Sequence, residues 1–144
     1  VLKRLAEGNA PEGLALIAGE QTEGRGRLGR SFYSPADSGV YMSLLLRPLC
    51  SAEETAKLTA GAAVAVAEAV EELSGLPAGI KWVNDVFIGD KKVSGILTEA
   101  SVDCESGLMN YVIIGIGINT RVPAGDFPDE LRGSAGAAHD EVGD

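Results

Sequence analysis

The chain has 144 residues and a net charge of −9, and hydrophobic residues make up 45% of it. This length suits one domain with its own core, and the acidic balance argues against a general nucleic-acid binder, because such proteins hold the phosphate backbone with a basic face. No apolar run reaches the roughly 18 residues that a membrane span needs and no signal peptide is visible, so we expect a cytoplasmic protein without a membrane partner.

The first third of the chain is predicted to contain one helix and two strands. Residues 1–7 have a helical pattern, and Gly8-Asn9-Ala10-Pro11 follow as a stop signal. The apolar run 14–18 predicts a short strand. The β-branched and apolar run 40–47 predicts a stronger strand that ends before Pro48.

A capping box predicts the start of a long helix. Ser51-Ala52-Glu53-Glu54 places Ser51 at the N-cap and a glutamate three residues later. Apolar residues then recur at spacings of three and four, which indicates one face packed on a core. Gly75 and Pro77 predict the end of the helix. The predicted face consists of Leu58, Ala62, Val66, Ala69 or Val70, and Leu73.

The region 80–118 has a β pattern throughout. Short runs at 80–83 and 86–88 flank Asn84-Asp85, and Gly89-Asp90 predicts a hairpin turn. Two longer strands follow, at 93–100 and 111–118, joined by a polar turn. Adjacent strands with a helix inserted early predict an α+β fold, with a mixed, mostly antiparallel sheet and helices packed on one face.

The stretch 19–30 has a composition that neither a packed helix nor a packed strand favours. Glycines and arginines alternate in Gly24-Arg25-Gly26-Arg27-Leu28-Gly29-Arg30. Glycine lets the backbone approach a ligand closely, and arginine holds carboxylate or phosphate oxygens with two parallel donors. The stretch therefore indicates an anion-binding loop. Alternatives are a flexible loop that binds nothing and an RGG-like nucleic-acid segment, whereas a Walker A loop is excluded by the missing lysine.

Three ordered motifs resemble those of biotin protein ligases. The stretch 21–30 is similar to the family's biotin-binding loop, and 81–85 with 91–99 resembles Lys-Trp-Pro-Asn-Asp followed by Lys-x-x-Gly-Ile-Leu-x-Glu. Residues 114–119 resemble a Gly-x-Gly-x-Asn strand end. The resemblance covers roughly residues 14–131, and it departs from the family pattern at Val83, where proline is usual, and at Phe32, where many members have tryptophan.

The resemblance implies a ligase with biotin, ATP and Mg²⁺ as ligands. Such an enzyme activates biotin with ATP to biotinyl-5′-AMP and transfers biotin to a specific lysine of a biotin carboxyl carrier protein. A homodimer is compatible with the family, and no nucleic-acid partner is expected of this chain. Residues 1–144 are expected to form one catalytic domain that lacks the family's N-terminal segment and its small C-terminal β-barrel domain.

The resemblance also assigns roles to individual residues. Arg27 and Lys92 match the cations that neutralise charge during adenylate formation, where removing one such donor typically costs about 100- to 1,000-fold in rate. The positions implied for biotin are Gln21, Gly24, Arg25, Gly95, Gly115 and Gly117. The positions implied for ATP or the adenylate are Arg30, Phe32 and Asn119. Asp85 is implied to help hold Mg²⁺, with a plain turn residue as the alternative, and Lys91 is expected to be a solvated neighbour of Lys92.

Other functions remain open at this point. A lipoate–protein ligase performs the same chemistry on another acid, but its Arg-Arg-x-Ser-Gly-Gly-Gly loop is missing here. A biotin-sensing transcriptional repressor module is a second alternative. A folded domain whose glycine-arginine loop is merely flexible is a third.

Overall fold

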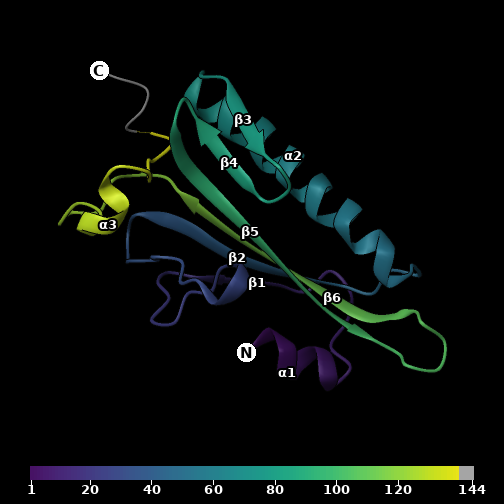
Figure 1. Cartoon of the computed structure of the whole chain (residues 1–144). Helices are drawn as coiled ribbons and strands as arrows, with labels where there is room; N and C mark the ends of the chain where they lie inside the picture. The colour runs from purple at the N-terminus through teal and green to yellow at the C-terminus, as the bar shows by residue number, and fades with distance from the viewer. Residues whose placement is uncertain (140–144) are drawn as a thin grey trace.

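A six-stranded antiparallel sheet organises residues 1–139, the part of the chain that the computed structural model describes (Figure 1). The strands follow the spatial order β1-β2-β6-β5-β4-β3. Their bounds are β1 (Ala15–Ala18), β2 (Gly39–Leu46), β3 (Ala78–Lys81), β4 (Asp85–Ile88), β5 (Lys91–Val102) and β6 (Met109–Asn119). The helices are α1 (Leu2–Glu7), α2 (Thr55–Ser74) and α3 (Asp129–Arg132), with short 3₁₀ turns η1 (Arg27–Gly29) and η2 (Ala52–Glu54).

The α+β fold class is confirmed, and the predicted elements all form within a few residues of their expected bounds. Every pair of named strands is antiparallel. The parallel pairing expected of a mixed sheet is represented by an isolated bridge between Lys92 and Ala135. The predicted turn at Gly89 joins β4 to β5, with φ +57° at that glycine. No helix among residues 1–139 is long and apolar enough to cross a membrane.

The predicted capping box starts the 3₁₀ turn η2, and the long helix α2 follows directly from that turn. The backbone N–H of Ser51 donates to Glu54 Oε2 at 3.1 Å. This hydrogen bond is the main reason that the pKa of the Glu54 carboxyl lies below its ordinary value, with nearby Lys57 adding to the effect. Gly75, in the left-handed conformation at φ +71°, ends the helix as predicted.

The predicted face of α2 is confirmed at Val66 and Val70, which are buried, and at Leu58 and Ala62, which pack against the core, and it is wrong at Leu73. The buried residues of the helix are Thr59, Ala63, Val66, Ala67, Val70 and Ser74, whereas Leu73 is 82% exposed and Leu58 is only partly buried. Small side chains such as Ala63 and Ala67 let the helix lie close to the sheet, and Thr59 Oγ1 hydrogen-bonds Thr98 Oγ1 of β5 at 2.8 Å. The buried face is therefore wider than predicted, since it includes Thr59, Ala63 and Ala67, and it excludes Leu73.

The short helix α1 covers the opposite face of the sheet, so the prediction of helices on one face is correct for α2 and wrong for α1. Side chains of a strand alternate between the two faces. On β6, Val112 and Ile114 pack in the cluster with α2, whereas Tyr111 and Ile113 pack with Leu2 of α1. The candidate site lies on this α1 face.

Candidate functional site

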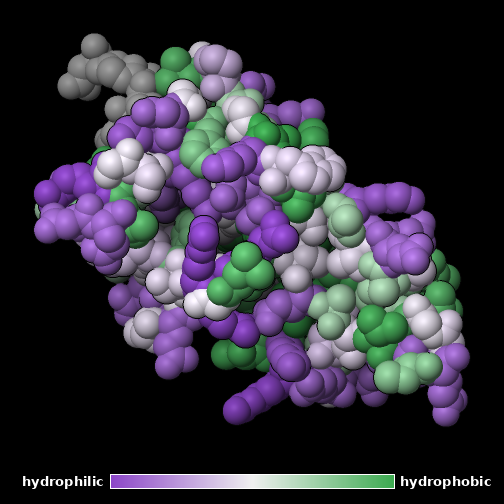
Figure 2. All heavy atoms as spheres, viewed as in Figure 1, coloured by the Kyte–Doolittle hydropathy of each residue, from purple (hydrophilic) through white to green (hydrophobic). Residues whose placement is uncertain are grey.

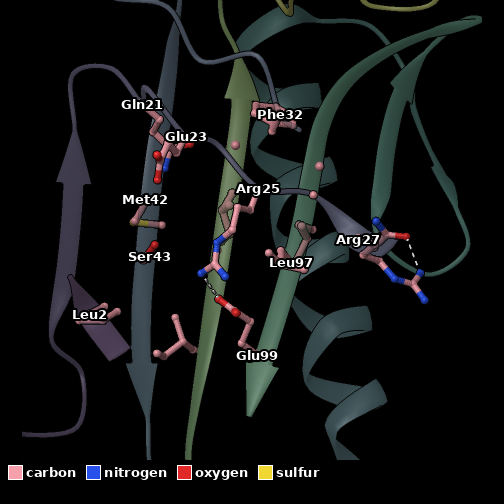
Figure 3. Close-up of a pocket in the computed structure, with 18 of the residues that line it drawn as sticks. Leu2, Gln21, Glu23, Arg25, Arg27, Phe32, Met42, Ser43, Leu97 and Glu99 are labelled. Carbon is pink, nitrogen blue, oxygen red and sulfur yellow. Dashed lines mark hydrogen bonds and ion pairs between the residues drawn. The ribbon is translucent and has the colours of Figure 1, made fainter. Parts of the chain in front are cut away.

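A hollow of about 540 Å³ lies on the α1 face of the sheet (Figure 3). Strands β2, β6 and β5 form its floor, the loop 21–34 crosses over it, and the start of α1 lines one end. The floor contains Ser43 of β2, Gly115 and Gly117 of β6, and Leu97 of β5. At Gly115 no side chain covers the sheet backbone, whereas the ring of Phe32 covers Gly117.

A pair of glycines forms a flat surface in this floor. Gly95 and Gly117 are direct cross-strand partners on β5 and β6, and the ring of Phe32 rests on them. A Cβ at Gly117 would lie 2.5 Å from Cε1 of Phe32, and a Cβ at Gly95 would lie 3.2 Å from Cε2. The ring therefore leaves no room for a side chain at Gly117 unless it moves, and little room at Gly95.

The arginine loop folds back on itself as an irregular hairpin over the sheet. Isolated bridges join Gln21 to Ser34 and Arg25 to Ser31. The Phe32 N–H donates to the carbonyl of Gly24 at 2.9 Å, and a Cβ at Gly24 would lie 2.2 Å from the carbonyl oxygen of Phe32. Gly24 is therefore required by the close approach of the two arms of the hairpin.

Two loop arginines reach in different directions from the loop (Figure 3). Arg25 Nη2 lies 2.9 Å from Oε2 of Glu99 on β5, with the two side chains 66% and 39% exposed. Arg27 Nη1 donates to Asn84 Oδ1 at 2.9 Å. Exposed pairs of this kind are each worth about 0.2–1 kcal/mol, so an anion that enters the hollow can displace them.

A third cation lies where β4 and β5 meet. Lys92 Nζ is 2.8 Å from Asp85 Oδ1, and both side chains are partly exposed. Asn84 Nδ2 also donates to that oxygen at 2.8 Å. Arg27, Asn84, Asp85 and Lys92 thus form one polar network at the edge of the hollow.

A second hollow, of about 380 Å³, lies along the loop. Arg25, Arg27 and Glu99 line both hollows, whereas Leu28 and Arg30 line only the second. The two hollows therefore share one wall, the arginine loop.

The structure brings most of the predicted site residues together at the first hollow. Those that line it are Gln21, Arg25, Arg27, Phe32, Asp85, Lys92, Gly95, Gly115 and Gly117. Gly24 shapes the hairpin instead, and Arg30 faces the second hollow. Asn119 does not line either hollow: it is 8% exposed, and its Nδ2 donates to the carbonyl of Gly136 at 3.1 Å.

Several residues around the hollow were not assigned a role from sequence. Glu99 and Asn84 belong to the motifs that resemble those of biotin protein ligases. Their position in these motifs could have marked them as site residues. Ser34 is buried, and its hydroxyl donates to Gln21 Oε1 at 2.9 Å, which fixes that amide. Leu2 lies beside the hollow only because α1 folds onto this face, and no local pattern marks it.

Known proteins match this fold and these motifs. Residues 1–119 match the Biotin/lipoate A/B protein ligase family. The Bifunctional ligase/repressor BirA of Bacillus subtilis is 46% identical over 140 residues, which are 97% of this chain and 42% of that protein.

Solved structures agree with the sequence matches. The biotin protein ligase of Aquifex aeolicus in complex with biotin and ATP superposes with a TM-score of 0.79 at 38% identity, covering 99% of this chain and 56% of that one. The Leishmania major enzyme in complex with biotinyl-5-AMP gives a TM-score of 0.75 at 29% identity, covering 98% of this chain and 59% of that one. The chain thus spans about half the length of the relatives that it matches.

Proposed function

Because the chain belongs to the Biotin/lipoate A/B protein ligase family, we propose that it activates biotin with ATP and transfers biotin to a lysine of a biotin carboxyl carrier protein. The observation that carries this proposal is the convergence of three cations, Arg25, Arg27 and Lys92, on one glycine-floored hollow. A binding site for an acid with a bulky ring and for a polyphosphate needs both features.

In the first step a carboxylate oxygen of biotin attacks the α-phosphorus of ATP. The bond to the β-phosphate breaks, and biotinyl-5′-AMP and pyrophosphate result. Two anions must approach each other, and at 4 Å unit charges repel by roughly 4 kcal/mol at an effective dielectric of about 20. Arg27 and Lys92 would offset this repulsion, since each lines the hollow and is held only by a partly exposed polar partner.

In the second step the lysine amine attacks the acyl carbon of the mixed anhydride. A C–N bond forms, the C–O bond to AMP breaks, AMP leaves, and the amine gives up a proton to solvent. No enzyme nucleophile takes part in this sequence. The hairpin loop over the hollow would protect the anhydride from water between the two steps.

Mg²⁺ is proposed to accompany the phosphates of ATP. Among residues 1–139, no group of three or more histidine, cysteine, aspartate or glutamate side chains is placed to hold a metal ion. Asp85 alone does not make a site, because its Oδ1 is already within 2.8 Å of Lys92 Nζ and Asn84 Nδ2. Mg²⁺ carried by the nucleotide supplies charge neutralisation at the phosphates, and the Asp85 assignment stays a prediction.

A thermal-shift experiment tests the acid that the hollow accepts. Biotin, lipoate and ATP are added to the protein singly and in pairs. We expect biotin to raise the Tm and lipoate to leave it unchanged, because Gly115 leaves the floor beside the Phe32 ring open to the bicyclic ring of biotin. Equal shifts with both acids, or no shift with biotin in the full-length protein, would contradict the proposal.

The repressor alternative is favoured by the name of the Bacillus subtilis relative, a bifunctional ligase/repressor. An electrophoretic mobility shift of the full-length protein with promoter DNA, with and without biotin and ATP, tests it.

A cytoplasmic location and a homodimer also belong to the proposed ligase function. Cell fractionation tests the location, and analytical ultracentrifugation tests the homodimer.

A further inference from the structure

Leu28, at the tip of the arginine loop, is an unusual residue in an unusual conformation. Its side chain is 91% exposed, and its backbone has φ 57° and ψ 36°. This left-handed region is disfavoured for leucine and is normally taken by glycine, asparagine or aspartate. A position that combines backbone strain with an exposed apolar side chain is typical of a functional contact.

Polar residues surround this leucine. Figure 2 shows hydrophilic side chains over most of the face seen in Figure 1, with hydrophobic surface in small separate patches. Arg27 precedes Leu28, and Arg25 and Arg30 line the same second hollow of about 380 Å³. The chain as a whole carries a net charge of −9, so three arginines around one hollow form a local positive site on an acidic protein.

The second hollow lies beside the proposed chemistry. Arg25, Arg27 and Glu99 line both hollows, so a protein that rests on the loop tip contacts the loop that also lines the proposed adenylate site. The acceptor lysine must reach the acyl carbon from outside the loop. The loop tip is therefore well placed to be a surface that the acceptor meets on approach.

We propose that the loop tip docks the acceptor protein, with Leu28 as an apolar anchor and Arg30, which lines only the second hollow, binding an acidic side chain near the acceptor lysine. This inference rests on the proposed ligase function and adds the surface by which the protein substrate is recognised. An apolar anchor at the centre of an interface supplies binding affinity, and charges at its rim that are opposite to those of the partner orient the partner. A second copy of this chain is the competing occupant, since it too is acidic.

The test separates the two half-reactions with Leu28→Asn. Asparagine tolerates the left-handed conformation, so the loop is kept while the anchor is removed. Leu49→Asn is the matched control, because Leu49 is 96% exposed and follows the end of β2, outside both hollows. ATP–pyrophosphate exchange reports adenylate formation, and transfer to a purified biotin carboxyl carrier domain reports the second step.

We expect Leu28→Asn to raise the KM for the carrier domain by about 5- to 30-fold, the effect of losing one good anchor. Pyrophosphate exchange should stay within about twofold of wild type. The carrier KM of the wild type should rise with salt, because exposed charges are screened. Replacing the acidic residues beside the carrier's lysine with their amides should raise the carrier KM less with Leu28→Asn than with the wild type, because the anchor and the charges cooperate.

Other outcomes overturn the inference in distinguishable ways. A parallel fall in exchange and transfer would place Leu28 in the adenylate site, and an unchanged carrier KM would leave no docking role. A change in oligomeric state at the same protein concentration would assign the surface to a second copy. A wild-type protein without pyrophosphate exchange would overturn the proposed function itself, and the docking surface with it.

Discussion

Replacing Gly117 with alanine should weaken biotin binding much more than it weakens the fold. A Cβ at this position would lie 2.5 Å from Cε1 and 2.8 Å from Cζ of Phe32. Carbon atoms in contact are separated by about 3.5–4.0 Å, so the ring must retreat by about 1 Å. Phe32 is half-buried at the end of a loop, so its displacement should cost at most about 1–2 kcal/mol, less than full burial of a phenylalanine provides.

The cost to biotin should be larger, because the added methyl group displaces the ring of Phe32, which itself lines the hollow. One methylene in an apolar pocket discriminates by about 1–3 kcal/mol, which is about 10- to 200-fold in affinity. We therefore expect the biotin Kd to rise by about 10- to 200-fold. The Tm should fall by only a few degrees, given roughly 2–8 °C per kcal/mol.

Isothermal titration calorimetry with biotin and a melting curve on the same samples measure both quantities. Gly79→Ala is the matched control: Gly79 also lies in a strand, β3, and a Cβ there would meet nothing within 4 Å. A Gly117→Ala protein that binds biotin like wild type would refute the assignment of the glycine floor to biotin. Equal losses in both variants would show that the effect comes from the sheet and not from the hollow.

Two further predictions concern the cations. Lys92→Ala should reduce pyrophosphate exchange by about 100- to 1,000-fold with little change in the melting curve. Lys91→Ala, whose Nζ donates to the Gly133 carbonyl, should keep its activity. Undiminished exchange in Lys92→Ala would return Lys92 to the solvated surface. Trypsin should cleave the free protein within the 25–30 loop and should cleave it much more slowly when biotin and ATP are bound. In the free protein the exposed contacts of Arg25 and Arg27 are weak, and fixing each loop residue costs about 1–2 kcal/mol of backbone entropy. Equal resistance to trypsin in both states would mean that the protein's own partners hold the loop.

Local sequence patterns were sufficient for the elements and their ends. The capping box at Ser51, the left-handed glycine at 75 and the hairpin turn at Gly89 each depend on residues within one turn of the chain. Such signals act over a few residues, so they can be recognised without knowledge of the rest of the fold. The alternation of glycine and arginine in the loop 24–30 likewise predicted an irregular loop, and the structure has a hairpin loop there, while anion binding by that loop stays a prediction.

Tertiary packing decided everything that depends on faces and on distant partners. The side of α2 that is buried, and the placement of α1 on the opposite face, follow from which side chains fit against the sheet. The strand register makes Gly95 and Gly117 direct partners, and it is this pairing that creates a flat floor for the ring of Phe32. Arg25 meets Glu99 across 74 positions of sequence, and Asn119 turns to Gly136 instead of the hollow. Periodicity in a sequence indicates that a helix or strand has an apolar face. Close packing of the whole chain decides which other element that face contacts, because interiors accept only side chains whose shapes fit together.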